Sequence, residues 1–239
     1  MKDLLKIGLI IADEDEYSPA LKYVEEFGGK EFNILGKKGH IIRIENSEKD
    51  IEVHMILCGI GKINATASTT YLALNKCDII LNCGLSGGVS GVSRGDIVIG
   101  TTFTEHDFNL TGFGYKLGEK PGQKYIYNGD ENLIKHFLNI FPEFKTGAMV
   151  TGDIFVNDSM LREKISEIFN PISCDMETAA IAYVCDSANI PFCSIRRISD
   201  DAGEDANTTY RSMNKLAESC LVDIVFEGIS KIFEKKNLI

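Results

Sequence analysis

Short apolar segments alternate with amphipathic segments along most of the chain. Residues 4–12 form a continuous apolar run, which is typical of a parallel strand that is covered on both faces. Alternating apolar and polar residues in Phe32–Leu35 and His40–Ile44, joined by Gly36–Gly39, predict an antiparallel pair of strands. Further strands are expected at 51–58, 79–83, 96–102, 146–150 and in the stretch Ser173–Asp205.

Apolar residues recur at helical spacing between these runs. Helices are expected after the acids Asp13–Glu16, over Ile63–Leu74, over Glu131–Ile140 and over Met160–Phe169. A long C-terminal helix is marked by Met213, Leu216, Ala217, Cys220, Leu221 and Ile224. Strands that alternate with helices predict an α/β fold. We expect one domain, residues 1–239, with a mixed, mostly parallel central sheet flanked by helices.

Composition narrows the class of protein. The chain has 44% hydrophobic and 25% charged residues and a net charge of -10, which disfavours a nucleic-acid or anionic membrane surface. The seven cysteines show no CxxC spacing and fall mostly in apolar runs, so a disulfide framework or zinc site is not expected. The apolar N-terminus is followed by acids, which indicates a buried strand instead of a signal peptide. We expect a cytoplasmic protein.

The stretch Ser173–Asp205 places two carboxylates where an open α/β sheet binds its ligands. Glu177 lies where a strand passes into a helix, and Asp200 ends the following strand. Ligands bind beyond the carboxyl ends of such strands. We therefore expect both carboxylates to face one ligand.

Other polar and glycine-rich segments allow two interpretations. The acids of 13–16 suit helix capping, but they also follow a strand end. Gly84–Gly88 predicts either a tight turn or a close approach of the backbone to a ligand. His106 is more typical of a structural residue than of a catalyst, and the long connection Thr104–Pro121 suggests a functional or partner-binding loop. Neither GxxxxGK[ST] nor GxGxxG occurs, which disfavours a nucleotide phosphate loop.

Several motifs in order resemble the methylthioadenosine/S-adenosylhomocysteine nucleosidases of the nucleoside phosphorylase superfamily. The resemblance runs from Ile7 to about Cys220, and no single motif is specific by itself. The motifs are Ile7–Ala12, Gly59–Lys62, Asn82–Gly88, Gly95–Val98, His106-Asp107, Phe113–Tyr115, Gly152-Asp153 with Phe155, Asp175–Glu177, and Arg196 with Ile198–Asp200.

The resemblance implies hydrolysis of an N-glycosidic bond with release of adenine, and it implies roles for individual residues. Asp200 would protonate or hydrogen-bond purine N7, and Glu16 would deprotonate the attacking water. Glu177 would hold the ribose 2′- and 3′-hydroxyls. The other residues implied to bind substrate are Ile60, Phe155, Val156, Met176, Ser199 and Tyr210, with Phe113 and Pro121 reaching the neighbouring pocket of a homodimer.

The chemistry of bond cleavage is consistent with these roles. An oxocarbenium-like sugar is stabilised by nearby carboxylates. A carboxyl in an apolar pocket stays protonated near neutral pH, which suits Asp200, whereas Glu16 must be ionised and is expected in a more polar setting. No metal or redox cofactor is required.

Water is the expected nucleophile. The related phosphorylases carry phosphate-binding arginines in the first turn and the central loop, where this chain has Ala12–Glu16 and Asn82–Gly84. Acids at a phosphate site repel an anion.

Three departures leave the substrate open. Asp13 replaces the usual methionine beside the 5′ substituent, Leu85-Ser86 replaces Ser-Ala, and Asp175 replaces a glutamate. A more polar 5′ group, a related hydrolase or phosphorylase acting on futalosine or another purine nucleoside, and a catalytically silent nucleoside-binding protein remain alternatives. Arg197 and Asp201 add charge beside the acid, without an assigned role.

Overall fold

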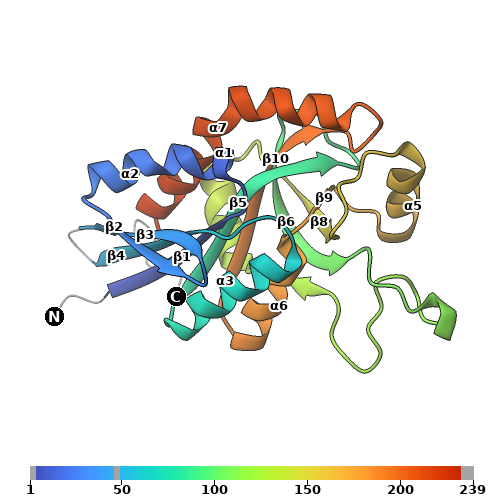
Figure 1. Cartoon of the computed structure of the whole chain (residues 1–239), viewed down its shortest axis with the longest axis horizontal. Coiled ribbons are helices and arrows are strands. Elements are labelled where there is room, and N and C mark those ends of the chain that lie inside the picture. Colours follow the sequence, from blue (N-terminus) through green and yellow to red (C-terminus); the bar gives the residue numbers. More distant parts are fainter. Residues whose placement is uncertain (1–3, 46–48, 233–239) are drawn as a thin grey trace.

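A ten-stranded sheet forms the centre of the molecule (Figure 1). The computed structural model describes residues 4–45 and 49–232, without the side chains of 211–220. The strands are β1 (Leu4–Ile11), β2 (Lys30–Ile34), β3 (Lys37–Ile44), β4 (Asp50–Leu57), β5 (Ile79–Gly88), β6 (Ile97–Glu105), β7 (Tyr127–Asn128), β8 (Lys145–Thr151), β9 (Ser173–Asp175) and β10 (Phe192–Asp200).

Helices connect most of the strands. The first helical segment is broken into short pieces around Pro19, which cannot donate a backbone hydrogen bond. The helices are α1 (Glu14–Tyr17), η1 (Ser18–Ala20), α2 (Leu21–Glu26), α3 (Lys62–Leu74), η2 (Thr111–Phe113), α4 (Glu131–Ile140), α5 (Ser159–Phe169), α6 (Thr178–Ala188) and α7 (Ala206–Ser230).

The sheet is partly closed on itself. Its order is β10-β6-β8-β9-β5-β1-β4-β3-β2, and a further pairing of β10 with β5 joins the first five strands into a ring. The pairings β1–β4, β1–β5, β5–β10, β6–β8 and β8–β9 are parallel. The pairings β2–β3, β3–β4, β5–β9, β6–β7 and β6–β10 are antiparallel. The α/β class and the mixed sheet are thus confirmed, and the longer ladders among the described strands, such as β1–β4 and β5–β10, are parallel.

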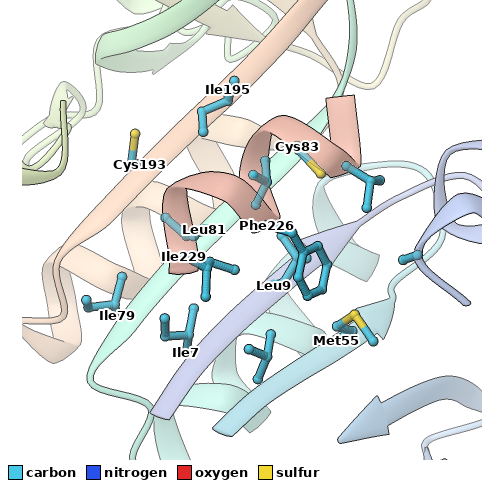
Figure 2. Close-up of a cluster of buried hydrophobic side chains, with 14 of the residues drawn as sticks. Ile7, Leu9, Met55, Ile79, Leu81, Cys83, Cys193, Ile195, Phe226 and Ile229 are labelled. Atoms are coloured by element: carbon cyan, nitrogen blue, oxygen red, sulfur yellow. The ribbon is translucent and has the colours of Figure 1, made fainter. Parts of the chain in front are cut away.

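Two hydrophobic layers cover the sheet. Alternate residues of β1 point to opposite faces, as in any strand. Leu5, Ile7, Leu9 and Ile11 pack in a cluster with α4 and α7 side chains such as Phe137 and Phe226 (Figure 2). Ile10 and Ala12 belong to a second cluster, with residues of α3 and α6. The core therefore lies on both faces of β1, as its continuous apolar run predicts.

The helix and strand predictions are confirmed in most places, and three differ in extent. Lys37–Gly39 belong to β3, so the turn between β2 and β3 is shorter than expected. β6 continues to Glu105, into the segment expected as a loop. The C-terminal helix exists as α7, although the packing expected of Met213, Leu216, Ala217 and Cys220 lies outside the described side chains. The other six cysteines are free and buried.

The largest difference concerns Gly84–Gly88. These residues do not form a turn but continue β5 to Gly88, where they pair with β10 and β9. Their glycines indicated a break because glycine is disfavoured inside strands. Pairing on both sides overrides that local preference. Among the described residues, no helix is long and apolar enough to cross a membrane.

Candidate active site

A cavity of about 300 Å³ opens beyond the carboxyl ends of β1, β5 and β10. It is bounded by residues from both halves of the chain. Its lining is Ala12, Asp13, Glu16, Ile60, Leu85, Ser86, Gly87, Ile154, Phe155, Val156, Cys174, Asp175, Met176, Glu177, Arg196, Ser199, Asp200 and Tyr210.

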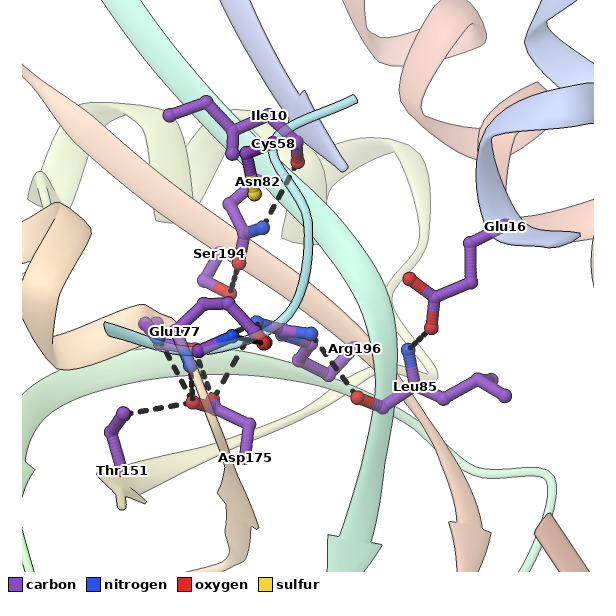
Figure 3. A network of polar contacts seen from close by, with 12 residues as sticks. Ile10, Glu16, Cys58, Asn82, Leu85, Thr151, Asp175, Glu177, Ser194 and Arg196 are labelled. Atoms are coloured by element: carbon purple, nitrogen blue, oxygen red, sulfur yellow. Dashed lines mark hydrogen bonds and ion pairs between the residues drawn. The ribbon is translucent and has the colours of Figure 1, made fainter. Parts of the chain in front are cut away.

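Glu16 reaches this cavity from α1, which begins directly after β1. Asp13 caps the helix, and its Oδ1 accepts a 2.8 Å hydrogen bond from the backbone N–H of Asp15. One turn later, Oε1 of Glu16 accepts a 2.7 Å hydrogen bond from the backbone N–H of Leu85 (Figure 3). Glu14 and Asp15 are exposed and do not line the cavity. Asp13 thus both caps the helix and lines the cavity, and Glu16 lines the cavity.

The setting of Glu16 is less polar than its expected role suggested. Desolvation raises the pKa of Glu16 to about 8, although the Arg196 guanidinium and the Leu85 N–H both act to lower it. The expectation of a polar, readily ionised environment is therefore wrong. Loss of hydration disfavours the ionised carboxylate by more than the Leu85 hydrogen bond and the Arg196 guanidinium favour it.

The glycines of β5 make room for these side chains. A Cβ at Gly84 would lie 2.7 Å from Nη1 of Arg196 and 2.8 Å from Oε2 of Glu16. A Cβ at Gly87 would lie 3.2 Å from Oδ1 of Asp200. The structure therefore excludes the tight turn for this segment. The groups that approach its backbone are the site's own side chains, and a close approach to a ligand stays a prediction.

Arg196 is a fully buried cation at the base of the cavity. Its Nη1 donates to the carbonyl of Leu85 over 3.1 Å, and its Nη2 donates to Thr178 Oγ1 over 3.0 Å. Nη2 also lies 3.4 Å from Oε2 of Glu177 and 3.8 Å from Oδ2 of Asp175. Burial of a charge is costly unless it is paired, and here two carboxylates pair with it.

Glu177 and Asp175, at the β9–α6 connection, make different hydrogen bonds. Asp175 is buried, and its Oδ1 accepts hydrogen bonds from the backbone N–H groups of Glu177 and Thr178 and from the hydroxyl of Thr151. These bonds satisfy donors at the start of α6. Glu177 instead accepts a 3.0 Å hydrogen bond from the N–H of Gly61. Burial raises the pKa of Glu177, and Arg196 opposes that shift.

Asp200 is the last residue of β10, which pairs with the edge of β5 opposite β1. Its Oδ2 accepts a 2.6 Å hydrogen bond from Ser199 Oγ, and its Oδ1 accepts a 2.8 Å bond from the N–H of Ala202. Ala202 adopts a left-handed conformation with φ 52°, which is unusual for a residue other than glycine. Burial raises the pKa of Asp200 although both hydrogen bonds act to lower it. This direction is the one expected for an acid that stays protonated.

Apolar side chains complete the cavity. The ring of Phe155 is 40% exposed and meets the ring of Tyr210 edge-on, with 5.8 Å between centroids. Val156 is buried, whereas Ile60 is 52% exposed. Exposed aromatic rings at a cavity mouth provide stacking surface for a flat ligand.

The Gly59–Lys62 turn is held by charged neighbours. Lys62 Nζ donates to Asp107 over 2.6 Å and to Glu105 over 3.3 Å. Asp153 accepts from the N–H of Lys62 and donates its own N–H to Asp107, each over 2.9 Å. This Lys is thus committed to carboxylates, and the turn is not arranged as a phosphate cradle.

Two residues expected at the site do not line it within one chain. Phe113 is 81% exposed on η2, and Pro121 is partly exposed in the same long connection. His106 is buried beside Gly152 and does not line the cavity, but its Nε2 has no hydrogen-bond partner among the described residues, unlike the hydrogen-bonded structural histidine that was expected. Arg197 and Asp201 also lie outside the lining. The remaining predicted residues all line the cavity: Glu16, Ile60, Phe155, Val156, Met176, Glu177, Ser199, Asp200 and Tyr210.

The sequence interpretation gave Arg196 no role, although it named the residue. Strand alternation could have placed Arg196 on the same side as Asp200, since they are four residues apart in β10. The shift in register between Ile198 and Asp200 then brings Ser199 to the cavity too. Within the described residues, no cluster of His, Cys, Asp or Glu side chains could hold a metal ion.

The chain also matches known proteins over nearly its whole length. A sequence model of the phosphorylase superfamily matches residues 6–225. A 5′-methylthioadenosine/S-adenosylhomocysteine nucleosidase of Geobacillus sp. (strain WCH70) is 33% identical over 236 residues, which cover 95% of this chain and 99% of the relative. The chain belongs to the 5′-methylthioadenosine/S-adenosylhomocysteine nucleosidases of the phosphorylase superfamily. The family resemblance inferred from the motifs is confirmed.

Solved structures of the family share the fold. The S-adenosylhomocysteine nucleosidase of Streptococcus pyogenes, in complex with 5-methylthiotubericidin, is 28% identical with a TM-score of 0.87 and covers 97% of this chain and 98% of its own. The futalosine hydrolase of Helicobacter pylori is 26% identical with a TM-score of 0.85 and covers 95% and 98%. The fold of this family therefore occurs with both kinds of nucleoside hydrolase.

Proposed function

We propose that this family member hydrolyses the N-glycosidic bond of an adenine nucleoside of the 5′-methylthioadenosine or S-adenosylhomocysteine type. The observation that carries this proposal is the cavity that gathers Glu16, Glu177 and Asp200 from β1–α1, β9–α6 and β10. Three carboxyl groups in one small cavity suit a reaction that develops positive charge on a sugar.

Glu16 acts as the base for water. Its ionised carboxylate removes a proton as the water oxygen attacks the anomeric carbon of the ribose. The bond from that carbon to N9 breaks, and its electrons move into the purine. The hydrogen bond from Leu85 fixes the carboxylate, so that the proton acceptor is held in place before substrate arrives.

Asp200 acts as the acid toward the leaving purine. Desolvation favours its protonated form, and it delivers that proton to N7 as the bond to N9 breaks. Adenine then leaves as a neutral molecule. Ser199 and Ala202 hold the carboxyl by its two oxygens and thereby set its orientation.

The remaining lining residues bind substrate. Glu177 accepts hydrogen bonds from the ribose hydroxyls, and Met176 packs against the sugar. Phe155 stacks on the base, the backbone of Val156 reads its edge, and Ile60 and Tyr210 close the sides. The reaction places the protein in methionine salvage and nucleoside catabolism.

Hydrolysis is favoured over phosphorolysis by the charge of the cavity. Arg196 is the one cationic lining residue among the described side chains, and its guanidinium is already paired with Glu177 and Asp175. Asp13 adds negative charge to the lining, and so does Glu16 in the ionised form that acts as the base. A phosphate ion would meet net repulsion there.

The deciding experiment is a panel of purified nucleosides assayed for free base with and without phosphate. We expect adenine release from 5′-alkylthioadenosines in phosphate-free buffer. An obligatory phosphate requirement would reject hydrolysis, and release of a 6-oxopurine in preference to adenine would favour a futalosine-type substrate. Binding of nucleosides without release of base would identify a silent binding protein.

The protein is further proposed to act as a cytoplasmic homodimer. Phe113 on η2 and Ile63 on α3 are 81% and 82% exposed, and Tyr183 on α6 is 47% exposed. Ile63, Tyr183 and Lys120 also border one groove, so the connection that contains Phe113 and Pro121 ends beside it. Large exposed apolar side chains are typical of an interface.

Mixing two defective variants tests the dimer. In a dimer whose Phe113 enters the neighbouring pocket, Glu16→Gln damages the pocket of its own subunit, whereas Phe113→Ala damages the pocket of the other subunit. Hybrids of the two contain one pocket with both intact residues, so mixing after subunit exchange restores a wild-type KM. No restoration, together with an active monomer in sedimentation, would contradict this arrangement.

A further inference from the structure

The cavity lining contains more carboxyl groups than the proposed reaction uses. Arg196 lies among Glu177, Asp175 and Glu16, and its nitrogens also donate to Leu85 and Thr178. No other lysine or arginine of the described chain lines the cavity. Its carboxyl-bearing lining residues are Asp13, Glu16, Asp175, Glu177 and Asp200.

Among these carboxyl groups, Asp13 has no part in the proposed reaction. Its Oδ1 caps α1 through the Asp15 N–H, whereas no described residue hydrogen-bonds its Oδ2. The residue is partly exposed, and its place at the helix start holds the carboxylate on the cavity wall. The helix cap thus orients a carboxylate with one oxygen available to a ligand.

The sheet order places Asp13 away from the acid of the reaction. Asp200 ends β10, β5 lies next to it, and β1 lies beyond β5. Asp13 follows β1, and Ile60 follows the next strand, β4. The family resemblance implies that Asp13 lies beside the 5′ substituent, and this order of strands is consistent with that place when the purine is at Asp200 and the ribose at Glu177.

We propose that Asp13 selects nucleosides whose 5′ substituent carries an ammonium group, over those with a neutral or an anionic group. The inference rests on the proposed orientation of the nucleoside. An ammonium group donates to the open oxygen of Asp13, whereas a carboxylate or phosphate is repelled by the Asp13 carboxylate. A charge-assisted hydrogen bond of this kind changes affinity by about tenfold to a hundredfold.

Three matched adenosine 5′-thioethers test the proposal. They carry 2-aminoethyl, propyl and 2-carboxyethyl groups, so their length is constant while their charge changes. We expect the wild-type protein to favour the amino compound over the propyl compound by about tenfold or more in kcat/KM, and to disfavour the carboxy compound. The preference should weaken with added salt, because salt screens charges at a partly exposed site.

Asp13→Asn is the informative variant. The amide oxygen still caps α1, so the helix start is retained while the charge is lost. We expect the ratio of amino to propyl kcat/KM to fall to about one. Glu14→Gln removes an equal charge from an exposed neighbour outside the cavity and should keep the wild-type ratio.

The same ratios measured as Kd separate this proposal from the proposed function. If the protein binds the three compounds but releases no adenine, hydrolysis fails while the Kd ratio still tests Asp13. An amino-to-propyl ratio near one in the wild type, or a ratio that Asp13→Asn leaves unchanged, would overturn the proposal. Binding of none of the compounds would overturn both.

Discussion

The backbone N–H of Leu85 donates a 2.7 Å hydrogen bond to Oε1 of Glu16, although 69 residues separate the two in the chain. The bond joins the start of α1 to β5 and fixes one oxygen of a carboxyl group whose pKa is raised by desolvation. A proposed base held in this way needs no reorientation when substrate binds, and such preorganisation raises the catalytic rate.

Replacing Glu16 by glutamine should remove the base and keep the fold. The amide oxygen can still accept from Leu85, so the thermal midpoint should not fall. General-base catalysis is typically worth about 10²–10⁴-fold, and we expect kcat to drop by that factor. Adenine release at saturating nucleoside measures it, with Glu14→Gln as the matched exposed control. Near-wild-type turnover in Glu16→Gln would remove Glu16 from the reaction.

The raised pKa of Glu16 predicts a pH dependence of activity. The base must be ionised in the free protein, and its pKa is about 8. We therefore expect ionisation of Glu16 to raise kcat/KM by about tenfold per pH unit below that value, whereas loss of the Asp200 proton lowers kcat/KM. A profile that is flat from pH 6 to pH 8 would contradict this assignment.

The same pKa predicts an effect on stability with a definite sign. Folding raises the pKa of Glu16 from its ordinary 4.5 to about 8, so the folded protein holds this proton more tightly. The resulting stabilisation is complete below about pH 4.5 and is lost as pH rises through about 8. Glu16→Gln lacks this term. Thermal melts should thus show the variant gaining on the wild type between pH 5 and pH 8, and a constant difference would argue against it.

Asp200→Asn should abolish proton delivery to the purine. Asparagine can keep a hydrogen bond to N7 and to Ser199, but it has no acidic proton, so kcat should fall by about 10²–10⁴-fold while KM changes much less. The neighbouring Asp201→Asn is the control, because Asp201 is exposed and outside the cavity. Equal losses in the two variants would mean that local structure, and not the proton, is responsible.

The fold and the two carboxylates Glu177 and Asp200 could be predicted from local sequence, and the family resemblance implied the other site residues. Contacts between distant strands could not be predicted. The apolar run of β1 and the carboxylate at the end of β10 are visible in the sequence alone. That Arg196, and not Arg197, is buried among carboxylates depends on the pairing of β10 with β5. The raised pKa of Glu16 similarly depends on desolvation by residues far along the chain.

The glycines of β5 left the sequence interpretation open for a related reason. At Gly84 the residue type suited either a turn or a close approach of the backbone to a ligand, and the structure shows close packing against side chains inside a strand. Local propensity cannot distinguish these cases, because the atoms that need the space come from α1 and β10. For Phe113 and Pro121 the proposed pocket belongs to the second subunit of the proposed dimer, and a single chain does not contain it.

Gly84→Ala tests whether the missing side chain is needed. The new Cβ would lie 2.7 Å from Nη1 of Arg196 and 2.8 Å from Oε2 of Glu16, and both groups are constrained by bonds to Leu85. Overpacking typically costs about 1–3 kcal/mol, which urea unfolding can measure. Displacement of the base should also lower kcat by more than tenfold, by about the cost of a misplaced catalytic group. Gly112→Ala is the control, because nothing lies within 4 Å of its Cβ and its φ is not in the left-handed region. If both variants matched the wild type in stability and turnover, the close approach at Gly84 would have no role in positioning Glu16.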